Sequence, residues 1–257
     1  MAKLIDLSIT LESRAGINYG HGEPEIIYTN HEESAQKRSA IYGLKPSDFD
    51  IREGRYAAVE RVCASTHETT HLDAPWHYTP ISEGKPAKTI EQIPLEWCYG
   101  DGVVLDFHHK KAGDGITARE VEDALEKIDY RLKPWDIVLI RTDAYKYYGK
   151  SEYATVHPGM TKESTLWLIE QGIKTMGIDA FGWDRPHQVM VSELKAGKKE
   201  SFWEAHYLGI EREYIHLERL ANLDKIPKPF GFKLFTFPIK IARASAGWVR
   251  AVAMFED

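Results

Sequence analysis

The sequence is poor in the features that mark several large classes of protein. It holds only two cysteines in 257 residues, Cys63 and Cys98, so at most one disulfide can form. No apolar stretch approaches the roughly 20 residues that a membrane-spanning helix needs. The first seven residues also lack the long apolar run of a secretory signal. We therefore expect a cytoplasmic protein whose cysteines are free and structural.

An excess of positive charge is also absent. Lysine and arginine total 33 against 39 acidic residues, and the net charge is −6 with the 11 histidines counted as neutral. Without a basic stripe, nucleic acid and membranes are not expected partners. The 19 glycines form neither a GxGxxG pattern nor a GxxxxGK pattern, so no phosphate-binding loop is predicted. A small-molecule substrate is the expected partner.

The apolar content is sufficient for a core, because 43% of the residues are hydrophobic. The length predicts one compact domain over residues 1–257. Residues 13–55 are polar and predict loops with short helices. Strands are expected at 4–11, 56–64, 102–107, 136–141, 174–179, 214–217, 232–237 and 248–254. Helices are expected at 117–128, 161–171 and 201–208, the first with a capping box and the second ended by Gly172. The fold class is mixed α/β and strand-rich.

Eleven residues from His67 to His77 carry an unusual density of ligand-type side chains. They are His-Glu-Thr-Thr-His-Leu-Asp-Ala-Pro-Trp-His, with three histidines and one aspartate. Imidazole and carboxylate groups are the ligands that borderline divalent metals prefer. Neither a packed core nor a solvated face explains such a cluster. The run therefore predicts a metal site.

The same run contains HExxH, the signature of a zinc protease helix, in His67, Glu68 and His71. That hypothesis needs a helix, so that both histidines share one face with the glutamate as base. The preceding segment is strand-like, and Thr69 and Thr70 are β-branched residues that disfavour a helix interior. The pattern favours a different site on a loop or short turn.

In that second interpretation, His67, His71 and Asp73 bind one metal ion, and Asp73 can bridge to a second. Pro75 stiffens the chain after the ligands. His77 is then free to move protons near neutral pH.

The run also resembles the HxGTHxDxPxH motif of the cyclase family of metal-dependent hydrolases, which includes kynurenine formamidases and isatin hydrolases. Thr69 stands where the motif has glycine. The segment 6–8 resembles the family's N-terminal DLS, and the segment 177–184 its GxDxxSxD, with Gly182 in place of serine. Residues 238–254 resemble its last two strands, which flank a loop near Ser245.

The resemblance implies a site and a fold. The metal ligands would be His67, His71, Asp73, His206 and Glu218, the last two being twelve residues apart as in the family. One or two zinc or manganese ions would bind per chain. The fold would be a swivelling β/β/α domain in homodimers or homotetramers.

The resemblance also implies a reaction. The enzyme would hydrolyse the C–N bond of a cyclic amide or an aryl formamide, with metal-bound hydroxide as nucleophile and His77 as proton shuttle. The substrate would be a small aromatic amide. The long segment between residue 8 and the cluster brings the chain nearer in size to the isatin hydrolases. Besides the protease, a catalytically silent, metal-stabilised binding protein is an alternative.

Several of these residues also have plainer explanations. Taken alone, His206 and Glu218 are typical of surface positions. His216 is a rival ligand, because a strand's period of two places it on the same face as Glu218; we expect it to contact the ligands. Glu68 is expected at the surface or beside the ligands. Four aromatic residues are expected either in a substrate pocket or in the core: Trp76, Phe181, Trp183 and Trp203.

Overall fold

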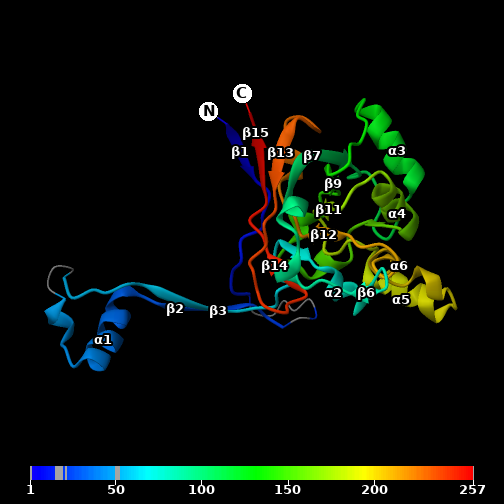
Figure 1. Ribbon diagram of the computed structural model, residues 1–257. Helices are drawn as coiled ribbons and strands as arrows, with labels where there is room; N and C mark the ends of the chain where they lie inside the picture. Colours follow the sequence, from blue (N-terminus) through cyan, green and yellow to red (C-terminus); the bar gives the residue numbers. More distant parts are fainter. Residues whose placement is uncertain (1, 15–19, 21, 50–52, 257) are drawn as a thin grey trace. The chain divides into compact units, whose positions relative to one another are not determined.

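The computed structural model describes residues 2–14, 20, 22–49 and 53–256. The chain divides into two compact units, one of residues 1–10 and 66–257 and one of residues 11–65. Each unit is considered by itself, and Figure 1 shows the elements of both.

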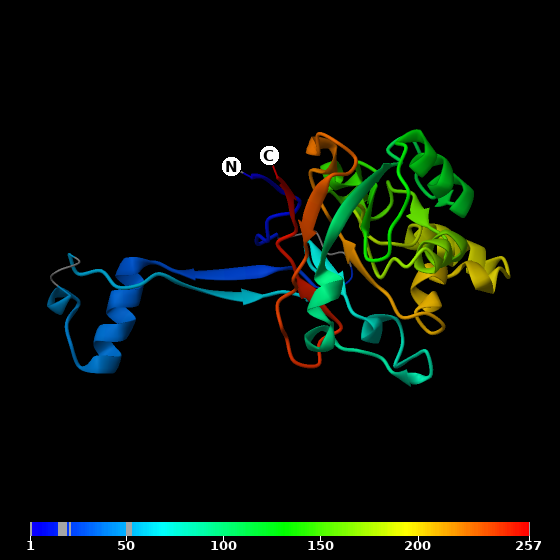
Figure 2. The same ribbon diagram turned by 45° about the horizontal axis from the view of Figure 1, so that its top comes forward.

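Within the described residues, the larger unit is built on a curled, nine-stranded mixed sheet (Figures 1 and 2). Its central strands run parallel and its outer strands antiparallel. In order across the sheet, the strands are β1 (Lys3–Asp6), β15 (Val252–Phe255), β13 (Phe232–Phe235), β7 (Tyr99–Asp106), β9 (Ile137–Arg141), β11 (Thr175–Ile178), β12 (Ile215–Glu218), β4 (His71–Asp73) and β14 (Ala246–Trp248).

The central strands form because their residues are apolar on both faces. Residues 137–140 of β9 are all buried, as expected for a parallel strand covered on both sides. On one side, α3 (Ala118–Lys127) and α4 (Lys162–Glu170) pack together beside the sheet. A separate apolar cluster joins side chains of β7, β9, β12 and β13 to the short 3₁₀ turns η3 (Ile90–Gln92) and η4 (Leu95–Cys98).

The predicted helices at 117–128 and 161–171 are confirmed. Thr117 caps α3 through a capping box with Glu120, and Thr161 caps α4. Gly172 follows α4 with a φ of 87°, the left-handed conformation expected of a helix stop. The helix expected over 201–208 is shorter, because Trp203 is also left-handed, with φ 53°, and separates η7 (Lys199–Ser201) from α6 (Glu204–Leu208).

Short elements complete the larger unit. Strand 4–11 ends at residue 6, and the strand expected over 248–254 is divided between β14 and β15. The remaining elements are α2 (Pro75–Tyr78), α5 (His187–Lys195), β5 (Ile81–Ser82), β6 (Lys85–Pro86), β8 (Gly115–Ile116), β10 (Gly159–Met160), η5 (Ala144–Tyr147), η6 (Ser151–Ala154) and η8 (Leu223–Lys225).

The smaller unit contains a two-stranded antiparallel ladder, β2 (Glu25–Thr29) with β3 (Val59–Cys63), together with α1 (His31–Tyr42) and η1 (Pro46–Asp48). The expectation of loops and short helices over 13–55 is therefore only partly right; residues 15–19, 21 and 50–52 lie outside the description. Seven large apolar side chains of this unit are exposed: Ile27, Tyr28, Ile41, Tyr42, Leu44, Val59 and Val62.

Two further expectations can be compared with the structure. Cys63 is exposed, Cys98 is buried, and both are free thiols. None of the helices in the described part of the chain combines the length and apolar content needed to cross a bilayer.

Candidate metal centre

The register of two paired strands assembles most of the site. In the antiparallel ladder between β4 and β12, His71 lies opposite Glu218 and Asp73 lies opposite His216. Because side chains alternate along a strand, all four project from the same face of the sheet, while Leu72 enters the core. Pairing of segments some 145 residues apart in sequence thus gathers two imidazoles and two carboxylates.

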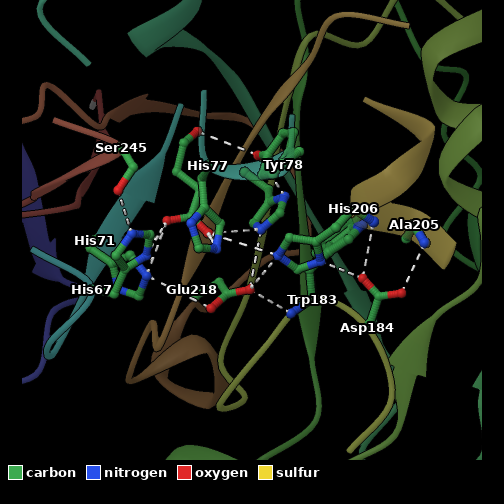
Figure 3. A network of polar contacts seen from close by, with 12 residues as sticks. His67, His71, His77, Tyr78, Trp183, Asp184, Ala205, His206, Glu218 and Ser245 are labelled. Carbon is green, nitrogen blue, oxygen red and sulfur yellow. Dashed lines mark hydrogen bonds and ion pairs between the residues drawn. The ribbon is translucent and has the colours of Figure 1, made fainter. Parts of the chain in front are cut away.

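His67 reaches this face from the turn that precedes β4. Residues 66–70 form turns and bends, and His71 begins a strand. The helix that a zinc protease motif requires is therefore not formed by His67, Glu68 and His71, and that alternative is wrong. His206 comes from α6 and His77 from α2 (Figure 3).

The donor atoms form two groups that share both carboxylates (Figure 3). In the first group, Asp73 Oδ1 lies 2.9 Å from His67 Nδ1 and 3.3 Å from His71 Nε2. Glu218 Oε2 lies 3.7 Å from the same nitrogen of His71. The first group thus holds two imidazoles and one oxygen from each acid.

The second group uses the other oxygen of each acid. Asp73 Oδ2 lies 3.4 Å from His216 Nε2 and 3.9 Å from His206 Nε2. Glu218 Oε1 lies 3.1 Å and 3.6 Å from the same two nitrogens. These four residues are buried, and their donor atoms are close enough together to hold one metal ion.

His77 borders both groups. Its Nε2 lies 3.8 Å from Asp73 Oδ2, and its ring is centred 4.0 Å from the ring of His67. With 21% of its side chain exposed, it is the most accessible of these histidines. Burial lowers the pKa of His77 to about 3, so the imidazole is neutral at neutral pH. It also forms a possible ligand trio with His67 and Asp73.

In three of the histidines, the ring nitrogen that points away from the shared carboxylates contacts a neighbouring polar group. The Ser245 hydroxyl lies 2.9 Å from His67 Nε2, and the Thr69 carbonyl accepts from His71 Nδ1 at 2.8 Å. The Asp184 carboxylate binds His206 Nδ1 and accepts the backbone N–H groups of residues 205 and 206. Such contacts fix each ring and direct its other nitrogen toward the carboxylates.

The buried donors of the centre favour a cation. His71 Nε2 and both oxygens of Asp73 are buried and lack a partner with hydrogen-bonding geometry among the described residues. Although burial opposes ionisation, the surrounding imidazoles hold the pKa of Asp73 and of Glu218 below the usual range. Burial lowers the pKa of His216, but the nearby carboxylates of Asp73 and Glu218 outweigh it and raise that pKa to about 9. The residues present fit a divalent metal ion.

Glu68 lies behind the centre and not at the surface. It is buried, accepts a hydrogen bond from the Tyr148 hydroxyl at 3.2 Å, and lies 3.7 Å from Arg219 Nη1. The guanidinium of Arg219 stacks 4.5 Å from the ring centre of Phe181. This buried ion pair links Glu68, in the turn before β4, to Arg219, which directly follows Glu218.

The four aromatic residues separate into different environments. Trp183 is buried and stacks on His216. Phe181 is also buried, and its ring contacts the guanidinium of Arg219. Trp183 and Phe181 therefore belong to the interior. Trp203 stacks on His206 with a centroid distance of 4.3 Å and meets His77 edge-on at 5.3 Å. Trp76 is 45% exposed. Trp203 is therefore the aromatic residue that borders the exposed side of the centre.

Comparisons with known proteins identify the family. The family model described as "Putative cyclase" matches residues 5–185. The chain belongs to the cyclase family. The matched range includes the run from His67 to His77, whereas His206 and Glu218 lie beyond it.

Two named enzymes are similar to this chain over most of its length. A kynurenine formamidase of Erythrobacter litoralis is 28% identical over 201 residues, covering 78% of each chain. An isatin hydrolase of Roseibium aggregatum is 26% identical over 219 residues, covering 82% of this chain and 79% of the other. Both relatives are hydrolytic enzymes by name, and this chain is an enzyme of the same family.

A solved structure shows the same fold. An isatin hydrolase bound to the product analogue thioisatinate matches 100% of this chain and 93% of its own, with a TM-score of 0.78 at 21% identity. The mixed α/β fold class expected from the sequence is thus confirmed by the structure, and the family resemblance is confirmed by the family model.

Proposed function

We propose that this cyclase-family enzyme is a metal-dependent hydrolase that cleaves the C–N bond of a small aromatic amide, either a cyclic amide or an aryl formamide. The observation that carries the proposal is that His71 Nε2 and both oxygens of Asp73 are buried without a hydrogen-bond partner among the described residues, with His71 Nε2 facing Glu218. The proposed ligands are His67, His71 and Asp73 for one ion, with Asp73, His206 and Glu218 for a second. Mixed imidazole and carboxylate donors suit zinc or manganese.

A bound divalent ion would polarise the amide carbonyl and bring the pKa of a water from about 15.7 to about 7. The chain's own residues then manage the protons. His77 faces Asp73 and is partly exposed, so its Nε2 can take a proton from the attacking water and return it to the leaving nitrogen. Ser245 and Asp184 keep the ligand rings in place during this exchange.

The neighbourhood of His77 favours an aromatic substrate. Trp203 stands edge-on to His77, and Trp76 directly precedes it with an exposed side chain. Flat indole surfaces bind aromatic rings well, at ring-centre distances of about 4.5–7 Å. Because one relative is an isatin hydrolase and the chain is long before the cluster, we favour the cyclic amide over the aryl formamide.

We further propose a homodimer or a higher homo-oligomer. Seven large apolar side chains of the smaller unit are exposed, including Tyr28, Ile41 and Val59, and a lone two-stranded ladder is marginally stable in water. A second copy that covers them would stabilise this unit. The single domain over residues 1–257, the swivelling β/β/α description and the cytoplasmic location stay predictions.

The test is an ultraviolet assay of the purified chain, loaded with zinc or manganese, on isatin and on formylkynurenine. We expect chelator-sensitive turnover of one of them, with isatin favoured, and no cleavage of casein. A matched His77→Gln protein serves as the control for background hydrolysis. A metal-loaded protein that binds both amides without turning over either would overturn the proposal and favour a silent binding protein.

A further inference from the structure

His216 is one of the fully buried side chains of the centre. Its ring lies between the rings of Tyr78 and Trp183, at centroid distances of 5.2 and 5.5 Å and interplanar angles of 12° and 16°. The residue has no solvent exposure. Two stacked partners therefore fix the ring plane, and Nε2 has one direction only, toward Asp73 and Glu218.

We propose that His216 is a fourth protein ligand of the second metal position, together with Asp73, His206 and Glu218. This inference rests on the proposed function, since it concerns the same metal centre. It adds a ligand beyond the five that the sequence predicts. It also gives the two positions different tasks.

The separations between the four donors suit a single metal ion. With metal–ligand distances of about 2.0–2.2 Å, neighbouring donors of a tetrahedral ion lie about 3.3–3.6 Å apart. The separations from His216 Nε2 to Asp73 Oδ2 and Glu218 Oε1 are 3.4 and 3.1 Å. Those from His206 Nε2 to the same oxygens are 3.9 and 3.6 Å. Four of the six donor pairs thus lie at or near the separations that one metal ion requires, and all four atoms lie within 4.8 Å of one another.

The hydrogen bonds of Tyr78 make the required nitrogen available. The Tyr78 hydroxyl donates to the backbone carbonyl of Asp73 at 3.4 Å and lies 3.0 Å from His216 Nδ1. Because a hydroxyl has one proton, a bond to the carbonyl leaves its oxygen to accept from Nδ1–H. With Nδ1 bonded in this way, Nε2 is the nitrogen that a metal ion held by the two carboxylate oxygens would bind in place of a proton.

Four protein ligands make a closed site. Such sites retain their ion and leave no position for water or substrate, whereas catalytic sites keep one position open. The exposed side chain of the centre, His77, stands with its ring centred 4.0 Å from the ring of His67, a ligand of the first position. The second ion therefore neutralises and braces the shared carboxylates, and the substrate meets the first ion.

The experiment counts ions without any substrate. Wild-type protein, His216→Leu and His157→Leu are loaded with zinc, dialysed and analysed for metal, and zinc affinities are then measured by competition with a chromogenic chelator. His157 is a matched control, because it is equally buried and is not among the proposed ligands. We expect two ions in the wild type and in His157→Leu, and one ion in His216→Leu.

Tyr78→Phe provides a second variant that keeps the stacked ring and removes only the hydroxyl. We expect it to weaken the second ion by about 10- to 100-fold, as loss of a group that orients a ligand does, and to leave the first ion unchanged. Two zinc ions with wild-type affinities in both His216→Leu and Tyr78→Phe would overturn the inference. An enzyme inactive on both amides, yet dependent on His216 for its second ion, would overturn the function alone.

Discussion

Thr69 adopts a backbone conformation that β-branched residues rarely adopt, with φ at 54°. The motif that this chain resembles has glycine at this position, and the left-handed φ is the physical reason. Two hydrogen bonds hold the strained residue in place. Its hydroxyl donates to the Ile9 carbonyl at 2.6 Å, and its carbonyl accepts from His71 at 2.8 Å. The conformation thus orients a proposed ligand.

Substitutions of Thr69 should separate the strain from the hydroxyl bond. Thr69→Gly removes about 1–2 kcal/mol of strain but loses a bond worth about 1 kcal/mol and adds unfolded-state entropy. We expect a free energy of unfolding within about 1 kcal/mol of wild type. Thr69→Val keeps the strain without the bond and should lose about 1–2 kcal/mol in urea titration. A valine variant as stable as wild type would show that the hydroxyl bond contributes nothing.

His77 and the proposed ligands should respond differently to truncation. His77→Ala removes a group that moves protons, so the metal content should stay at the wild-type value while kcat falls by about 10²- to 10⁴-fold. His71→Ala and Asp73→Ala remove donors and should lose metal together with activity. Elemental analysis beside the ultraviolet assay separates the two classes. Equal loss of metal and turnover in His77→Ala would instead identify His77 as a ligand.

At the scale of the elements, local signals predict some features and fail for others. The capping box and apolar stripe of α3 predict its bounds closely, whereas α1 has no such stripe and buries only Ser34, Ala35 and Ser39. Strand β4 is three residues long and exists because β12 and β14 flank it. The sequence therefore predicts the ligand types but not the pairing that brings them together.

The same limit applies to the residues that hold the ligands. Asp184 lies in one of the segments that resemble the family, and Ser245 lies in another. The contacts of Asp184 with His206 and of Ser245 with His67 nevertheless do not follow from the spacing of these residues in the sequence. Tyr78 carries no sequence signal beyond its place after His77. These contacts depend on tertiary packing, which a single sequence does not reveal.

The N-cap of α3 gives a prediction at this scale. The Thr117 hydroxyl oxygen accepts from the backbone N–H of Glu120, and the Glu120 carboxylate accepts from the backbone N–H of Thr117. Thr117→Ala should lower the free energy of unfolding by about 1 kcal/mol, and Thr117→Ser should restore most of it. Denaturant titration measures both, with metal content unchanged as the control. Equal stability of the alanine and serine variants would exclude a capping contribution.

At the scale of the whole molecule, the two thiols report on global opening. Cys63 is exposed, whereas burial raises the pKa of Cys98 to about 12. Because the thiolate is the reactive form, Cys98 is protected both by burial and by its protonation at pH 8. We expect a disulfide reagent to modify one thiol of the native protein at pH 8 and both after unfolding in urea. Rapid modification of both thiols in the native protein would contradict the buried position of Cys98.

The pairing of the first strand with the last has a consequence for how the protein is made. Strand β1 joins the sheet only through β15, with Lys3 opposite Phe255 and Asp6 opposite Val252. A ribosome that adds about 5–20 residues per second releases β1 many seconds before its partner exists. Strand β4 likewise waits for β12 before His71 meets Glu218. The pairing that completes the proposed metal site therefore forms late in synthesis, well after β4 has been made.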